Sequence, residues 1–226
     1  YKQKHRATKL ISKSIYSLPE INGGDLKKYQ IIACPGCYPT SILLPLIPLF
    51  KYNLVKTKNI IIDSKSGYSG AGRGVHKRYE NKNLYESLSA YGVGYHRHNS
   101  EIDQMLNKFT KKKINFNFTP HLVPMFRGIL STVYIDLEKG VNQKKVIKKL
   151  SDFYNNDDFV KILKADSLIG TNDVINTNNC LISVCKTKYK DKIIILSTID
   201  NLIKGGAGQA VQNLNLKFNF PLTTAL

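Results

Sequence analysis

Two stretches of the chain, residues 99–111 and 141–154, carry apolar residues at every third or fourth position. This spacing predicts one amphipathic helix in each stretch. A polar residue that can cap the first helix, Asn99 or Ser100, stands at its start. The apolar faces comprise Ile102, Met105, Leu106 and Phe109 in the first helix and Val146, Ile147, Leu150 and Phe153 in the second.

Two more helices are predicted, one over 36–50 and a final one over about 207–216. The first contains Pro45 and Pro48, which must kink or divide it because proline has no N–H to donate within a helix.

Alternating or β-branched runs predict strands between these helices. We expect 115–125 to pair antiparallel with 128–137 around a turn at Arg127-Gly128, and 179–187 to pair with 192–199. Neighbouring strands outnumber the helices, which favours an α+β fold with helices on one face of a mixed, mostly antiparallel sheet. The expected strands are 11–19, 29–33, 58–63, 115–125, 128–137, 179–187 and 192–199.

The composition is that of a globular protein, with 42% hydrophobic and 22% charged residues in 226. No apolar run approaches the roughly 20 residues that span a bilayer, so no membrane association is expected. The chain starts at Tyr1 without a signal-peptide pattern, and we expect a fragment of a longer protein. Four cysteines give no sign of an oxidising compartment, and the cytoplasm is the expected location.

The formal net charge of +18 raises the possibility of a nucleic-acid-binding protein. The lysines are spread along the whole chain, however, and accompany an excess of Asn and Ile, which indicates a compositional bias. Neither a recognition-helix pattern nor an aromatic RNA-binding signature is present. We therefore expect no nucleic-acid partner, although the charge would attract an anionic small molecule.

The most informative cysteine is Cys37, which follows a predicted strand and opens a predicted helix. A thiol at a helix N-terminus lies in a positive field beside free N–H groups, which favour the thiolate and can hold an oxyanion. Other interpretations of the Cys34-x-x-Cys37 spacing are a redox pair, half of a zinc site, or simple burial. No second pair of Cys or His residues has ligand spacing, so we expect no metal.

Residues 95–102 hold two histidines, His96 and His98, around Arg97. In an extended segment two residues apart point to the same side, so one ring could act as acid and base while the other, or Glu101, orients it. Packed or surface histidines are the equally acceptable alternative.

Glycines cluster in residues 66–74 and again in 205–208. Backbone N–H groups in such loops can cradle phosphates, or an anion at the entrance to the last helix. A flexible connection explains either cluster as well.

Five ordered motifs, covering nearly the whole chain, resemble the N-acetyl-gamma-glutamyl-phosphate reductase family. Residues 34–40 are similar to its Pro-Gly-Cys-Tyr-Pro-Thr motif, and 66–73 to its Ser-Gly-x-Ser-Gly-Ala-Gly-Arg loop. Residues 96–102 resemble its His-Arg-His-x-Pro-Glu-Ile stretch, with Ser100 in place of Pro. The other two segments are 118–128 and 200–210.

This resemblance implies a glyceraldehyde-3-phosphate-dehydrogenase-like catalytic and dimerisation domain with the remnant of a Rossmann domain. Residues 1–35 would end the NADP-binding Rossmann domain, 36–200 would form the catalytic domain, and 201–226 would return to the Rossmann domain as a helix. A homodimer or homotetramer is implied as well.

The implied reaction is NADPH-dependent reduction of a small acyl phosphate, with Cys37 as the nucleophile that forms a thioester. The implied catalytic partners are His96, His98 and Glu101. Cofactor contacts would come from Ser66, Gly67, Ser69, Gly70, Ala71, Asn201, Gly205 and Gly206, and substrate contacts from Tyr38, Arg73, Arg97 and Arg127. The alternatives are a carrier-bound aminoadipyl-phosphate reductase, an aspartate-semialdehyde dehydrogenase, and an inactive dimerisation or nucleic-acid-binding module.

Overall fold

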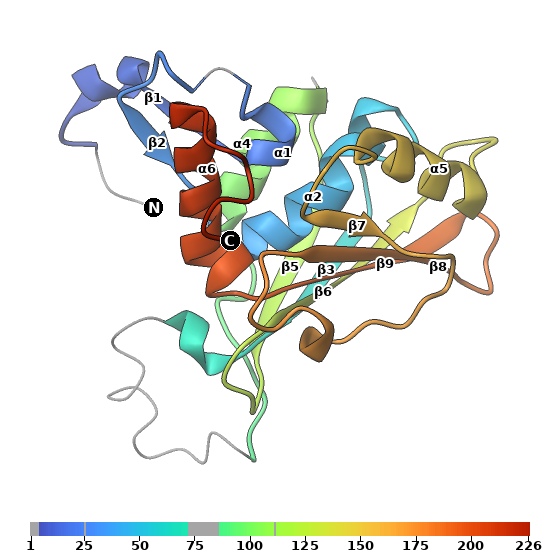
Figure 1. Ribbon diagram of the computed structural model, residues 1–226. Coiled ribbons are helices and arrows are strands. Elements are labelled where there is room, and N and C mark those ends of the chain that lie inside the picture. The colour runs from blue at the N-terminus through green and yellow to red at the C-terminus, as the bar shows by residue number, and fades with distance from the viewer. Residues whose placement is uncertain (1–4, 25, 72–85, 111) are drawn as a thin grey trace.

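A seven-stranded mixed sheet forms the centre of the computed structural model, which describes residues 5–24, 26–71, 86–110 and 112–226 (Figure 1). The strand order is β4-β5-β3-β6-β9-β8-β7. The pairs β3–β5 and β7–β8 are parallel and the others antiparallel. The mixed, mostly antiparallel sheet expected from the sequence is therefore confirmed. Its strands are β3 (Ile60–Ser66), β4 (Ser89–Ala90), β5 (Phe116–Leu122), β6 (Ile129–Asp136), β7 (Val160–Ile162), β8 (Cys180–Lys186) and β9 (Lys192–Ile199).

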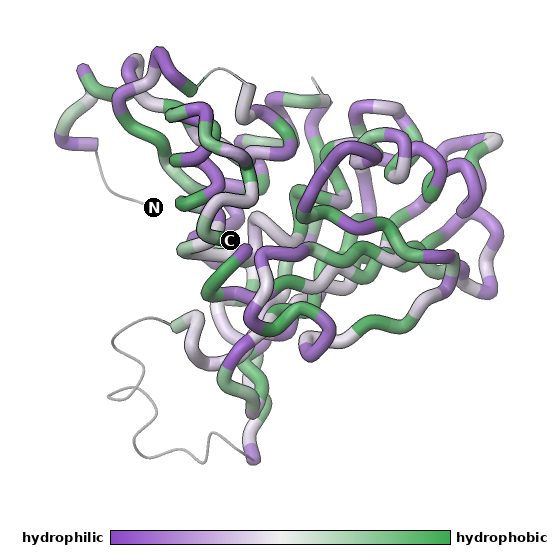
Figure 2. Tube along the Cα trace, viewed as in Figure 1, coloured by the Kyte–Doolittle hydropathy of each residue, from purple (hydrophilic) through white to green (hydrophobic). Residues whose placement is uncertain are grey.

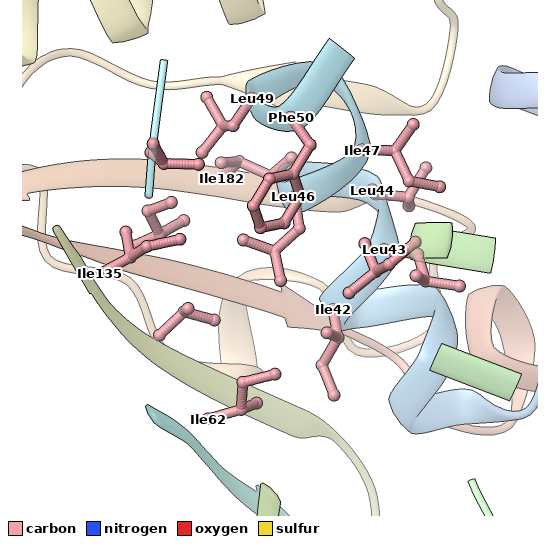
Figure 3. Close-up of a cluster of buried hydrophobic side chains, with 14 of the residues drawn as sticks. Ile42, Leu43, Leu44, Leu46, Ile47, Leu49, Phe50, Ile62, Ile135 and Ile182 are labelled. Carbon is pink, nitrogen blue, oxygen red and sulfur yellow. The ribbon is translucent and has the colours of Figure 1, made fainter. Parts of the chain in front are cut away.

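One face of this sheet packs against helix α2 (Cys37–Lys51), which is buried from Tyr38 to Phe50. Alternation along the strands turns residues such as Ile62, Ile135 and Ile182 toward the helix, where they meet its leucines (Figure 3). In Figure 2 the hydrophobic colouring follows this interior, and polar residues gather on the outer turns. A helix that is apolar all round, as α2 is, has to be buried on every side.

Pro45 and Pro48 lie inside α2, yet the helix runs through both without dividing. Pro48 cannot donate to the carbonyl of Leu44, four residues earlier. The Tyr154 hydroxyl donates to that carbonyl instead, at 2.6 Å. A side chain from another helix thus replaces the missing backbone donor.

The predicted amphipathic helices are confirmed as α4 (Asn99–Thr110) and α5 (Gln143–Phe153), on the same side of the sheet as α2 (Figure 1). Asn142 caps α5 by accepting a hydrogen bond from the backbone N–H of Lys145. Buried Ile102, Met105 and Leu106 are the inward face of α4.

A smaller unit combines the first and last parts of the described chain. It contains the 3-10 helix η1 (Thr8–Lys13), the parallel pair β1 (Ser14–Tyr16) and β2 (Ile31–Ala33), and the short helix α1 (Pro19–Asn22). The C-terminal helix α6 (Gly208–Phe218) packs beside them (Figure 1). A π-helical turn, η4 (Ile203–Ala207), leads from β9 into α6.

Two strand predictions are wrong. Residues 11–19 do not form one strand, because η1 takes residues 11–13 and α1 begins at Pro19, and only Ser14–Tyr16 pair as β1. Strands β5 and β6 exist but do not pair, since β3 lies between them and pairs with both. The six-residue connection over 123–128 is long enough to cross the end of β3. The sequence also gave no sign of the short strands β4 and β7.

The other sheet face carries Ile61 on β3 and Tyr134 on β6, which are paired across the strands and 49% and 43% exposed. Part of this face lies under residues 163–178, where Ser183 donates to the Ser167 carbonyl and Thr198 to that of Gly170. Leu168 in this segment is 90% exposed. In the described ranges no helix is long and apolar enough to cross a membrane.

Candidate active site

Cys37 is the first residue of α2, after Gly36 in the N-cap position. The backbone N–H groups of Cys37 and Tyr38 point at its sulfur. Gly205 of η4 packs on the other side, so closely that a Cβ there would lie 2.7 Å from the Cys37 Cβ. The helix start and the π-helical turn thus hold the thiol between them.

Burial raises the pKa of the Cys37 thiol to about 11. The two N–H groups and the charge of Arg97 act in the opposite direction, and the charge of Glu101 adds to the rise. The helix start therefore does not by itself make Cys37 a thiolate, contrary to the expectation from sequence, because desolvation outweighs it. A nearby base has to take the proton.

Two imidazoles are available as that base. His96 and His98 lie with ring centroids 4.7 Å apart, and both rings face the edge of the Tyr38 ring. His98 also packs directly against Gly36, where a side chain would collide with its ring. Both histidines line the same cleft as Cys37, although residues 97 and 98 lie in a turn and not in an extended segment.

Burial lowers the pKa of both rings, that of His98 to about 4. Glu101 partly opposes this for each of them. Both imidazoles are therefore neutral near pH 7, and His98 is the weaker base because burial lowers its pKa to about 4.

Glu101 joins the histidines to the nucleophile helix. One carboxylate oxygen accepts hydrogen bonds from the Gly36 N–H at 3.0 Å and from the Tyr16 hydroxyl at 2.8 Å. The other lies 3.9 Å from Nε2 of His98. The carboxylate thus holds the Gly36 N–H and the Tyr16 hydroxyl, while 3.9 Å is too long for a hydrogen bond to His98, and its role in orienting an imidazole stays a prediction.

A cleft of about 570 Å³ opens over these groups. It brings together the sulfur, both imidazoles, Arg97 and the glycine loop, which come from three distant parts of the sequence. Sequence reasoning did not single out Tyr91 and Tyr95, which also line it. The residues lining it are Cys37, Tyr38, Ser66, Gly67, Gly70, Ala71, Ser89, Ala90, Tyr91, Gly92, Tyr95, His96, Arg97, His98 and Leu122.

In the described part of the glycine loop, the N–H groups of residues 67–70 are not free for a ligand. Four successive N–H groups, from Gly67 to Gly70, donate within the protein, three of them to the chain after β5. The interpretation of residues 67–70 as a phosphate cradle is therefore wrong. The acceptors are the carbonyls of Gly128, Met125, Phe126 and Gly67.

The remaining expected contact residues hold the loops in place. Asn201 accepts from the Gly128 N–H at 2.6 Å and donates to the Ser69 hydroxyl at 3.0 Å. Arg127 pairs with buried Asp200 at 3.3 Å and also contacts Asn176, and it is not among the residues that line the cleft. Arg73 lies outside the described residues.

In the second glycine cluster, Gly205 donates to the Asp200 carbonyl and Ala207 to that of Leu202. Gly206 has φ −154° and ψ −106°, which interrupts the helix. Neither Gly205 nor Gly206 is a cleft-lining residue, and Gly205 instead contacts Cys37.

The four cysteines are free thiols. Cys34 lines a separate cavity of about 240 Å³ with Tyr16 and Glu101, whereas Cys37 lines the main cleft. The two sulfurs therefore face different spaces. Among the described residues, no group of three or more His, Cys, Asp or Glu side chains could hold a metal ion.

Residues 37–201 match the family model for the semialdehyde dehydrogenase dimerisation domain. The whole chain is 45% identical to a probable chloroplastic N-acetyl-gamma-glutamyl-phosphate reductase of Arabidopsis thaliana, covering 56% of it. It is also 45% identical to the N-acetyl-gamma-glutamyl-phosphate reductase of Desulforamulus reducens, covering 65% of it. The chain thus spans between half and two thirds of these relatives.

Among solved structures, the fold resembles aspartate semialdehyde dehydrogenase II from Vibrio cholerae with a TM-score of 0.71. The match covers 92% of this chain and 69% of that one at 20% sequence identity. At this identity the likeness concerns the fold alone.

Proposed function

The chain belongs to the semialdehyde dehydrogenase dimerisation-domain family, and on that premise we propose that it is the catalytic part of an N-acetyl-gamma-glutamyl-phosphate reductase. One observation carries the proposal. A single cleft contains a thiol at a helix start, two neutral imidazoles and an arginine. An acyl phosphate needs a nucleophile, a base and a cation, and these residues supply all three.

The first step begins with proton transfer from the Cys37 thiol to an imidazole. His96 is our choice as the acceptor, and His98 is the alternative. The sulfur then attacks the acyl carbon, and the bond between that carbon and the oxygen of the phosphate group breaks. Phosphate departs with the electron pair, leaving a thioester on Cys37.

Arg97 is suited to the phosphate group because it lines the cleft and its charge reaches the sulfur. The N–H groups of Cys37 and Tyr38 are suited to the oxyanion that forms on the acyl carbon. In the second half of the reaction, the carbon–sulfur bond breaks as the aldehyde leaves, and the imidazolium returns its proton to the Cys37 sulfur.

A nicotinamide cofactor, NADPH in our proposal, would supply the hydride that reduces the thioester. The described residues fit its nicotinamide end: Gly67, Gly70 and Ala71 have little or no side chain and leave room in the cleft beside the thiol. They do not fit its pyrophosphate, because the loop N–H groups already have acceptors. We therefore assign the rest of the cofactor site to the part of the relatives that this chain does not span.

The comparison with the longer reductases supports the proposed division of the chain. Residues 1–35 would belong with a cofactor domain, 36–200 would be the catalytic domain, and 201–226 would pack back on the cofactor domain. We also propose a homodimer or homotetramer in which the sheet face with Ile61 and Tyr134 meets a second copy.

The test is acylation of Cys37 in this chain by N-acetyl-gamma-glutamyl phosphate. The reaction is monitored by the release of phosphate and by mass spectrometry of the cysteine peptides. We expect one phosphate per chain, loss of the reaction in Cys37→Ser, and near-normal rates in Cys34→Ser. Equal loss in both variants would support a dithiol mechanism instead. Modification at other cysteines but not at Cys37 would refute the proposed nucleophile.

A further inference from the structure

A buried ion pair lies directly behind the π-helical turn that contacts Cys37. Lys204 of η4 pairs with Glu20 of α1, and both side chains are completely inaccessible to solvent. Gln212 of α6 accepts from Lys204 at 2.7 Å and donates to Glu20 at 2.7 Å. The ammonium also lies 5.3 Å from the centre of the Phe159 ring.

Burying two full charges is costly, and replacing such a pair by apolar residues often leaves stability unchanged or raises it. The second oxygen of Glu20 is buried without a hydrogen-bond partner among the described residues. Stability alone therefore explains this cluster poorly. A directional cluster does, however, fix the place of the backbone that carries it.

The backbone that carries Lys204 continues at once into Gly205, the residue packed on Cys37. On its other side, the Gly205 N–H donates to the Asp200 carbonyl at 2.9 Å. Gly206 departs from helical geometry in the middle of this turn. The ion pair is the contact that ties the turn to α1.

We propose that Glu20 and Lys204, with Gln212, are positioning residues for Cys37: they hold the turn at Gly205 against its Cα and Cβ and so set how far the side chain is exposed to the cleft. The proposal rests on the nucleophilic role of Cys37 only for its meaning in catalysis. The placement itself can be measured without any substrate.

Cys37 is partly exposed where it lines the cleft, and loosening the turn should expose its sulfur further. Because burial is the largest cause of the raised pKa of Cys37, the pKa should fall from about 11 toward its ordinary value. A fall of one unit gives about tenfold more thiolate at pH 8. The variants should therefore raise the alkylation rate of Cys37, whereas a substitution that impaired only catalysis would leave that rate unchanged.

The experiment measures alkylation of Cys37 by iodoacetamide between pH 7 and pH 10, with peptide mass spectrometry to separate the four cysteines. Glu20→Gln and Lys204→Met test the pair. Gln212→Met is the milder variant, because it keeps the two charges together. If the other two variants do not fold, its alkylation rate tests the proposal. Circular dichroism and urea unfolding establish that each variant is native.

The matched control is Asp136→Asn, which breaks the ion pair with Lys192 between β6 and β9. We expect roughly tenfold faster alkylation of Cys37 in the pair variants and an unchanged rate in the control. Native variants with the wild-type rate would overturn the proposal, and so would an equal acceleration in Asp136→Asn, which would indicate general loosening. Failure of acylation in the wild-type chain would count against the proposed function and not against this placement.

Discussion

Gly205→Ala adds one methyl group at the tightest contact of the nucleophile. The new Cβ would lie 2.7 Å from Cys37 Cβ, 3.0 Å from Cys37 Cα and 3.1 Å from Ile199 Cδ1. Carbon atoms normally approach to about 3.5–4.0 Å, so the overlap is roughly 1 Å. Overpacking of this kind costs about 1–3 kcal/mol, and the better helix propensity of Ala returns at most about 1 kcal/mol.

The larger effect should be on chemistry. A displacement of about 1 Å at a reacting group can slow a reaction roughly 10²-fold. Urea unfolding should therefore show a loss of about 1–2 kcal/mol, and acylation of Cys37 by N-acetyl-gamma-glutamyl phosphate should slow by about two orders of magnitude. Gly170→Ala is the control, because a Cβ there meets nothing within 4 Å. An acylation rate in Gly205→Ala within twofold of the wild type would refute the reasoning.

Three further predictions concern pH, assembly and cofactor. Burial lowers the pKa of His98 from 6.5 to about 4, so between these values the unfolded chain binds a proton that the native chain does not. The free energy of unfolding should fall by about 3 kcal/mol as the pH drops from 7 to 4, and the fall in His98→Gln should be smaller by about this amount. Equal falls for the two proteins in urea unfolding would contradict this. Light scattering should show a dimer or tetramer, and Tyr134→Asp should yield monomers because it places a charge in the proposed interface; a monomeric wild type at micromolar concentration would disprove it. Isothermal titration should detect only very weak NADPH binding, since the contacts described are too few to offset the entropy lost on binding. Micromolar affinity would show that the chain holds a complete cofactor site.

Local patterns in the sequence were enough to predict the elements whose stability is local. Helix α5 follows from its apolar spacing, and the β8–β9 pair follows from two β-rich runs around a short polar turn. Strand order was not predictable in the same way. The connection over 123–128 gives no sign that β3, about 60 residues earlier in the chain, lies between β5 and β6.

The candidate site shows the same division. The motifs identified Cys37, His96, His98 and Arg97, and the structure places all four in one cleft. The hydrogen bonding and packing of the site residues, however, depend on residues that are distant in the sequence. Three of the glycine-loop N–H groups donate to residues 125–128, and Cys37 packs against Gly205, 168 positions later. Neither follows from local spacing. The passage of α2 through Pro48 likewise required Tyr154.

The contacts between the two ends of the described chain determine when each end can complete its folding during synthesis. Lys204 and Glu20 are 184 positions apart, and Asn213 reaches the Ser17 carbonyl across 196. At roughly 5–20 residues per second, α1 would leave the ribosome about 10–40 s before its partner. During that interval Glu20 lacks Lys204 and Gln212, and β1 and β2 lack α6. Within the described chain, α1 and the β1–β2 pair therefore take their final packing only after α6 has been made.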